Sequence, residues 1–258
     1  VVWPLLSVFR ASLIGEWSLE LGLENYQTFF TSNYFRGALI NSLWVSFLAM
    51  IGTLLVGVPM ATIVARYRLP GKGLVWVLTV LSLISPPFIG AYAWIIMLGR
   101  NGFVTRFLTG LGLEVPTIYG PTGMVLVFVL QFYPIIFLLT YGALQSVDRS
   151  LEEAAMNLGY PRWKVFWTIT LPVIFPSVAA GALLVFLSAL SDFGTPMVIG
   201  EGFRVLPTLA YNLFMSELGG NPAMASTTSV IMVVTCILIL MVQRWVVSRR
   251  RYVMDSYT

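Results

Sequence analysis

The sequence contains no histidine and only one cysteine, Cys236, which lies within an apolar run. Without histidine, the common zinc sites and histidine-based acid–base catalysis are excluded, and a lone cysteine cannot form an internal disulfide. Charge is also scarce, because only 10% of the 258 residues are Asp, Glu, Lys or Arg, against about 25% in a soluble domain. Hydrophobic residues make up 58% of the chain. A soluble core of this size could not bury them, so lipid must be the solvent for much of the surface.

The apolar residues form runs long enough to cross a bilayer, which takes about 20 residues of helix. Backbone polar groups in lipid must be bonded within the structure, and the runs do not alternate as barrel strands do, so the spans are predicted to be helices. The sequence therefore predicts an all-α polytopic helical bundle with five full spans and the end of a sixth. The full spans are predicted at residues 38–64, 74–98, 121–144, 173–195 and 225–247, and residues 1–9 are predicted to be the tail of the sixth.

Basic residues divide unequally between the two sets of loops, and the richer set marks the cytoplasmic side. This predicts a multi-pass protein with a cytoplasmic C-terminus. The net charge of +4 is then an asymmetry across the membrane, and no nucleic-acid partner is predicted. The richer set is Arg66, Arg68, Lys72, Arg149, Arg162, Lys164, Arg244, Arg249, Arg250 and Arg251, and the poorer set is Arg10, Arg36, Arg100, Arg106 and Arg204.

The longest loop on the predicted cytoplasmic side, residues 146–172, carries helix signals. Ser150 followed by Glu153 fits a capping box, which predicts a helix that begins at Leu151. Apolar residues then recur at helical spacing and predict an apolar stripe. The stripe is Leu151, Ala154, Ala155 and Leu158.

A second short helix is predicted in the same loop. Gly159 stands where a helix C-cap is expected, and Pro161 suits the first turn of a following helix. That helix would place Trp163, Phe166 and Trp167 on one face. The loop is therefore predicted to be a helix, a glycine turn and a second helix, with apolar side chains that need a partner.

The residues of this loop also follow a longer pattern. Glu153-Ala154-Ala155 is followed after three residues by Gly159, after nine more by Ile169, and after one more by Leu171-Pro172. The pattern resembles the EAA motif of the permease subunits of binding-protein-dependent ABC importers with the type I fold. The resemblance covers essentially the whole chain, because the six-span layout also matches. The alternative is an incidental amphipathic loop, in which these fixed distances would arise by chance.

The resemblance implies a role for each part of the chain. Residues 1–258 would form one transmembrane domain of the bacterial inner membrane, and the coupling loop 146–172 would dock on a dimer of ABC ATPases. Glu153 would either cap its own helix or pair with a basic residue of the ATPase. The coupling residues implied are Glu153, Ala154, Ala155, Leu158, Gly159, Ile169, Leu171 and Pro172.

The resemblance also implies that ATP binding and solute capture are carried out by partner proteins. The sequence has no G-x-x-x-x-G-K-[S/T] phosphate loop, so ATP and Mg would be bound by the ATPase. This chain would then be a translocation subunit, with no enzymatic activity and no cofactor of its own. The other implied partners are a periplasmic substrate-binding protein and a second permease half, which is identical, homologous or fused to this one.

Asp192 is the charged residue predicted to lie within or at the edge of a span. Intramembrane charges are costly and often functional, so Asp192 is either part of a translocation pathway or gate, or a carboxylate that caps a helix or faces an interface. Gln131 and Asn41 are candidates for a sparse polar lining, and each could equally form a helix–helix hydrogen bond. A single carboxylate argues against an ATP-independent secondary transporter, which would need several for ion coupling.

Two segments bear on the cargo. Asp192-Phe193-Gly194-Thr195-Pro196 and the segment 85–91 are similar to ferric-iron permeases, while permeases for aminoethylphosphonate, thiamine and polyamines share parts of these patterns. The resemblance therefore favours ferric iron and leaves the other cargoes as alternatives. Tyr92, Tyr133 and Tyr141 could add oxygen ligands, but they fit packing or interface positions better, and no metal site of this chain is predicted.

Overall fold

The computed structural model describes residues 2–14, 21–67, 70–84, 87–114, 116–216 and 220–251. Within these ranges the chain is helical apart from its connections and one isolated β-bridge between Ile14 and Leu21. The predicted all-α class is therefore confirmed. The helices are α1 Val2–Leu13, α2 Glu24–Thr31, α3 Asn33–Arg66, α4 Lys72–Ile84, α5 Pro87–Leu98, α6 Phe103–Gly110, α7 Pro121–Ser146, α8 Arg149–Asn157, α9 Arg162–Val165, the π-helix η1 Phe166–Thr170, α10 Leu171–Ser191, α11 Gly194–Ile199, α12 Leu206–Met215 and α13 Pro222–Arg251.

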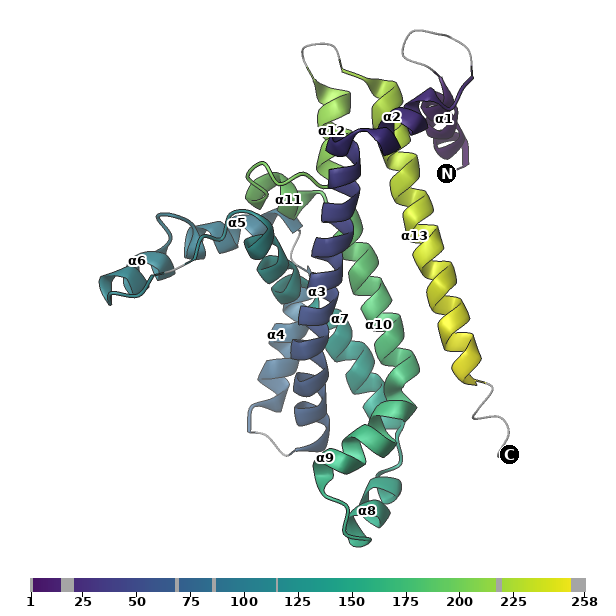
Figure 1. The fold of residues 1–258 in the computed structure, drawn as a ribbon. Helices are drawn as coiled ribbons and strands as arrows, with labels where there is room; N and C mark the ends of the chain where they lie inside the picture. Colours follow the sequence, from purple (N-terminus) through teal and green to yellow (C-terminus); the bar gives the residue numbers. More distant parts are fainter. Residues whose placement is uncertain are drawn as a thin grey trace.

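Three long helices, α3, α7 and α10, form the centre of the molecule (Figure 1). Their facing sides carry small and apolar residues, which form the main core. At Gly57 of α3, an added Cβ would lie only 2.7 Å from Cβ of Ile136 on α7, and at Gly52 it would lie 2.4 Å from Val129 Cγ2. These glycines therefore let the backbones of α3 and α7 approach closely.

Four continuous helices of the described chain are long and apolar enough to cross a membrane. They correspond to four of the five predicted full spans, although the predicted 173–195 is too long at its end, because α10 stops at Ser191 and Asp192 is its C-cap. The four helices are Asn33–Arg66, Pro121–Ser146, Arg162–Ser191 and Pro222–Val246.

The predicted span 74–98 is not one straight helix, and its crossing of the membrane stays a prediction. Helix α4 is followed after a short break by the α5–α6 segment, and the stretches Lys72–Leu83 and Phe88–Gly110 are bent by 113° relative to each other. Proline provides the reason, because Pro86-Pro87 lacks two backbone N–H groups and disfavours helix at the preceding residue. The pair is either one broken span or a re-entrant segment.

The two ends of the bundle carry different elements (Figure 1). Helices α8 and α9 lie at one end, which we call the α8 end, and α2 and α12 lie at the other, the α12 end. Helix α1 is also at the α12 end, packed on α13. Residues 1–9, predicted to end a sixth span, fall mainly in this 12-residue helix, and the sixth span stays a prediction.

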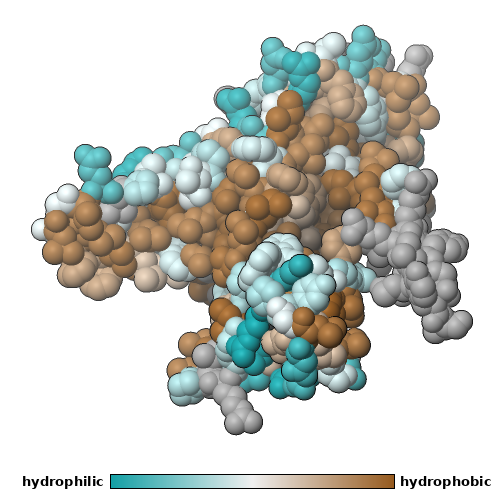
Figure 2. All heavy atoms as spheres, turned by 60° about the horizontal axis from the view of Figure 1, so that its bottom comes forward, coloured by the Kyte–Doolittle hydropathy of each residue, from teal (hydrophilic) through white to brown (hydrophobic). Residues whose placement is uncertain are grey.

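Apolar side chains cover the outside of the bundle. Figure 2, which views the molecule with the α8 end toward the reader, shows a broad apolar surface over the body and the α5–α6 arm, with polar residues gathered around the α8 end. Large apolar side chains are exposed on α4, α6 and α13, including Leu78, Leu81, Phe107, Leu238 and Met241. A surface of this kind suits a hydrocarbon solvent or a second membrane subunit.

Candidate functional site

Helix α8 begins at Arg149, two residues before the predicted start. Its N-cap is Asp148, whose Oδ1 accepts a hydrogen bond from the backbone N–H of Ser150 at 2.9 Å. The capping box predicted from Ser150 and Glu153 is therefore wrong, because the extended Asp148 offers a short carboxylate two residues before Ser150. The same hydrogen bonding by Ser150 holds the pKa of Asp148 below its ordinary value.

The predicted glycine turn is confirmed. Gly159 has φ +90°, in the left-handed region that residues with a side chain rarely adopt. Its N–H donates to the carbonyl of Met156 at 2.9 Å, and the N–H of Tyr160 donates to the carbonyl of Ala155 at 3.2 Å. These two bonds are the Schellman arrangement that closes a helix C-terminus. Pro161 then precedes α9 as its N-cap, one position before the predicted first turn.

The predicted apolar stripe of α8 divides between two faces. Ala155 is buried against the bundle, whereas Ala154, Leu151 and Leu158 are exposed, Leu158 with 80% of its surface. Trp163 and Trp167 of the following segment are exposed as well, at 68% and 62%. The α8–α9 unit therefore presents apolar side chains outward, at an end of the molecule where the surrounding surface is polar (Figure 2).

The remaining residues of the predicted motif lie where the loop joins the bundle. Ile169 belongs to the π-helix η1, which runs directly into α10 at Leu171 and Pro172. Ile169 and Leu171 are half-buried, and Pro172 is exposed. A π-helical turn inside a longer helix often marks a functional position.

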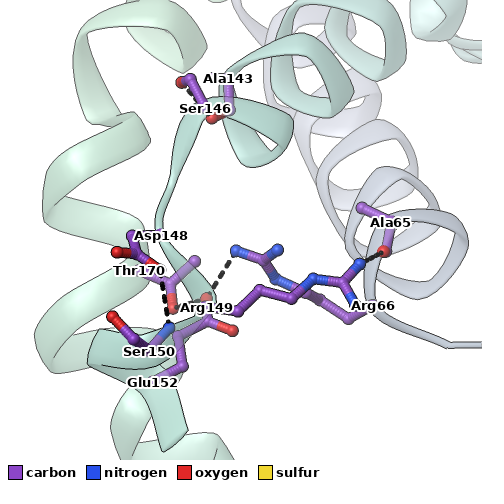
Figure 3. Close-up of polar contacts among 9 residues, drawn as sticks. All are labelled: Ala65, Arg66, Ala143, Ser146, Asp148, Arg149, Ser150, Glu152 and Thr170. Atoms are coloured by element: carbon purple, nitrogen blue, oxygen red, sulfur yellow. Dashed lines mark hydrogen bonds and ion pairs between the residues drawn. The ribbon is translucent and has the colours of Figure 1, made fainter.

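The inward face of α8 carries polar contacts that the sequence analysis did not identify (Figure 3). Glu152 Oε1 accepts a hydrogen bond from Arg66 Nη2 at 2.7 Å, and both side chains are only 14% exposed. The same oxygen accepts a hydrogen bond from Thr170 Oγ1 at 2.8 Å. Arg149 Nη2 donates to the backbone carbonyl of Ala65 at 3.1 Å. These contacts attach α8 to the end of α3 and to η1.

A groove of about 530 Å³ lies between these elements. It combines arginine, glutamate and aromatic side chains, and Glu153 lines it from α8. Its wall runs along the ends of α3, α8, α9 and η1. The lining residues are Thr62, Arg66, Tyr67, Arg149, Glu152, Glu153, Met156, Arg162, Trp163, Val165, Phe166, Trp167 and Thr170.

Asp192 lies in the interior of the molecule, directly after α10. Its Oδ1 accepts a hydrogen bond from the backbone N–H of Thr195 at 2.9 Å, in the first turn of the short helix α11. The side chain of Gln131, from α7, lies against the Asp192 carboxyl group. Gln131 Oε1 is buried and has no hydrogen-bond partner within the described part of the chain. Two of the three predicted pathway residues are thus brought together.

The third predicted pathway residue, Asn41, has a different contact. Asn41 Nδ2 donates to the backbone carbonyl of Arg204 at 3.0 Å, and the neighbouring Ser42 Oγ accepts from the N–H of Leu206 at 2.7 Å. These bonds tie α3 to the segment that leads into α12. The geometry is that of an inter-element hydrogen bond, and the assignment of Asn41 to a pathway stays a prediction.

Two of the tyrosines considered as extra ligands have different surroundings. Tyr141 stacks on Phe137 with Lys72 over its ring, and Tyr92 is exposed. Among the described residues, no group of three or more His, Cys, Asp or Glu side chains could hold a metal ion.

Comparison with known proteins identifies the family of this chain. Residues 54–252 match the family described as binding-protein-dependent transport system inner membrane component. The chain is 30% identical over 99% of its length to the ferric transport system permease protein FbpB of Actinobacillus pleuropneumoniae, of which it covers 37%. It is 31% identical over 83% of its length to the molybdenum transport system permease protein ModB of Escherichia coli, of which it covers 95%.

The structural comparison agrees on the fold. A chain in a crystal structure of a bacterial alginate ABC transporter, bound to its periplasmic protein, superposes with a TM-score of 0.76 at 20% identity, over 94% of this chain and 86% of that one. The chain spans less than two fifths of the length of the Actinobacillus relative. The family match, which covers well over half of the sequence, shows that this membrane-embedded chain belongs to the binding-protein-dependent transport system inner membrane components, the permease subunits of ABC transporters.

Proposed function

We propose that this chain is the permease subunit of an ABC importer, which moves a small solute from a periplasmic binding protein into the cytoplasm by alternating access. The observation that carries the proposal is the α8–α9 unit, which projects outward at one end of the bundle (Figure 1). Leu151 and Leu158 are exposed there beside the tight turn at Gly159. Apolar side chains exposed on a polar end of the molecule indicate a protein partner.

In this proposal the partner is a dimer of ABC ATPases. The exposed face of α8 enters a groove of the ATPase, and Glu153, which is exposed, pairs with a basic residue of it. Small residues let the helix approach closely, and the turn at Gly159 fixes its direction. The coupling residues are Glu153, Ala154, Ala155, Leu158, Gly159, Ile169, Leu171 and Pro172.

The remaining parts follow from the same proposal. The ATPase holds ATP and Mg, so this chain needs no cofactor for its own part. The α8 end and the C-terminus face the cytoplasm, because the loops at that end carry the excess of basic residues. A second permease half, identical, homologous or fused, covers part of the apolar surface in Figure 2, and the binding protein docks at the α12 end. In that case the whole chain, residues 1–258, acts as one transmembrane domain.

Ferric iron is the proposed cargo. Sequence identity does not separate the ferric from the molybdenum permease, at 30% and 31%. Asp192 favours a cationic cargo such as ferric iron, because a buried carboxylate attracts a cation and repels an anion such as molybdate where water is scarce. The adjacent amide oxygen of Gln131, which is buried and has no hydrogen-bond partner among the described residues, would also face a cation favourably. We therefore place Asp192 and Gln131 in the pathway or its gate.

The test is uptake into vesicles that contain the complete transporter, with its ATPase and cognate binding protein. ATP-dependent accumulation of radiolabelled ferric iron is expected, with little molybdate, aminoethylphosphonate, thiamine or polyamine. Preferential uptake of one of those solutes would overturn the iron assignment and keep the transporter class. Uptake that is driven by an ion gradient without ATP would overturn the class itself.

A further inference from the structure

Glu152 lies at the meeting point of three elements, and its contacts go beyond the docking role proposed for α8. Arg66 is the last residue of α3, Thr170 is the last residue of η1, and both bond to the same oxygen, Glu152 Oε1. We propose that the Glu152–Arg66 ion pair is a strut that carries the displacement of α8 to α3 and to the base of α10. This inference rests on the proposed function.

Two contacts fix α8 against the end of α3. Arg149 and Glu152 are three residues apart on α8, so their side chains lie on the same face of the helix. Arg149 donates to the carbonyl of Ala65, and Glu152 accepts from Arg66 (Figure 3). Carbonyls in the last turn of a helix have no intrahelical partner, and a cation there is favourable. With two attachments on one face, α8 cannot pivot freely on α3.

The third contact extends the strut to α10. Thr170 closes the π-helical turn, and its hydroxyl donates to Glu152 at 2.8 Å. The chain continues from Thr170 into α10 without a break, as far as Ser191. A pull on α8 therefore reaches two of the central helices through one carboxylate oxygen. The opposite end of α10 leads directly into Asp192, about 33 Å away along the helix.

Two adjacent glutamates thus have different surroundings. The Glu152 side chain is 14% exposed and paired within the chain, whereas Glu153 is exposed. Glu153 is therefore free to meet the ATPase, while Glu152 holds α8 to the spans. Substituting only one member of an ion pair so far removed from water is costly, because the remaining charge loses its partner without regaining full hydration.

A strut and a purely structural contact predict different defects. Loss of a structural contact would lower assembly, ATP hydrolysis and uptake together. If the strut is lost, α8 still docks on the ATPase, but its displacement no longer moves α3 and α10. ATP hydrolysis then continues while the amount of solute moved per ATP falls.

The experiment measures uptake and ATP hydrolysis in the same vesicles, with the complete transporter. Glu152→Gln and Arg66→Met should each lower uptake per ATP by about five-fold or more, with the ATPase still bound. The double variant should be no worse than either single one, because both remove the same interaction. Glu114→Gln and Arg106→Met, exposed and outside the α8–α9 loop, are the matched controls and should keep the parent ratio.

Unchanged uptake per ATP in both single variants would overturn the strut, as would defects that multiply in the double variant. Amide hydrogen exchange of the purified chain gives a readout that needs neither ATPase nor solute. Glu152→Gln should speed exchange in the last turn of α3, residues 61–66, as well as in α8. If the parent shows no ATP-driven uptake, the proposed function fails, and the exchange result still decides the strut, because unchanged exchange in α3 would overturn it.

Discussion

Arg100 and Glu201 form an exposed ion pair although 101 residues separate them in the sequence. The pair joins the end of the α5 segment to the turn after α11, and Arg100 also lies over the ring of Tyr119, 5.0 Å from its centroid. The Gly120 N–H donates to the carbonyl of Ile199 nearby. Three connections between helices therefore meet, which requires that they lie on one side of the membrane.

Cysteine labelling should report this arrangement. Cys236 is the only native cysteine, so Cys236→Ser provides a background for single reporters. We expect Asn101→Cys to react with an impermeant reagent added outside intact cells, and Tyr160→Cys to react only after the membrane is opened, because the basic excess predicts that the α8–α9 loop is cytoplasmic. Labelling of residue 160 from outside would reverse the proposed orientation.

The turn at Gly159 should tolerate side chains according to their left-handed propensity. At φ +90°, Gly159→Val meets a conformation that costs an L-residue about 1–2 kcal/mol, whereas asparagine adopts it more readily. Gly159→Asn should therefore retain more ATPase binding and uptake than Gly159→Val, measured by co-purification and vesicle transport. Equal activity of the two variants would show that the turn does not set the direction of α8.

Asp192→Asn should separate a pathway role from a capping role. Asparagine keeps the shape and can still accept from the N–H of Thr195, but it removes the charge. If Asp192 faces the cargo, ferric uptake falls by about ten-fold, the equivalent of 1.4 kcal/mol in the barrier, at unchanged ATPase assembly. The control is Glu114→Gln. Parental uptake by Asp192→Asn would leave Asp192 with a structural role alone, as the acceptor for the Thr195 N–H.

The close approach of α3 and α7 predicts a difference between two glycines of α3. Gly57→Ala places a methyl group 2.7 Å from Ile136, and overpacking of this kind costs about 1–3 kcal/mol. Gly37→Ala meets nothing within 4 Å, so the better helix propensity of alanine should stabilise the protein by about 0.5–1 kcal/mol. Thermal unfolding in detergent should thus shift in opposite directions. A stabilised Gly57→Ala variant would contradict the packing.

Local patterns predicted the long elements well. Residues 121–144 and 38–64 were predicted as spans, and the helices run from Pro121 to Ser146 and from Asn33 to Arg66. Hydropathy identifies such helices because lipid imposes one rule along their whole length. Hydropathy alone does not locate the bend between α4 and α5, since an apolar run stays apolar whether or not its helix is broken. Pro86-Pro87 is the local signal for that bend.

The candidate site was predictable only in part. Gly159 was identified because a C-cap glycine is a property of the local sequence, and Asp192 because a charge in an apolar run is conspicuous. Glu152 was missed, since its partner Arg66 lies 86 residues earlier and no local pattern joins them. Asp148 offered a local signal, an acidic residue just before a helix, but the Ser150–Glu153 spacing drew the prediction two residues too far.

The paired glycines of α3 also restrict how the bundle can move. Gly52 receives Val129 and Gly57 receives Ile136, so side chains of α7 fill two notches of α3. If α7 slid along α3 by one residue, about 1.5 Å along the axis, these branched side chains would leave the notches. They would then clash with neighbouring parts of α3. Rocking of the two helices as one body keeps both notches filled. Opening and closing of the passage should therefore be a tilt of the α3–α7 pair, with no change of register between its members.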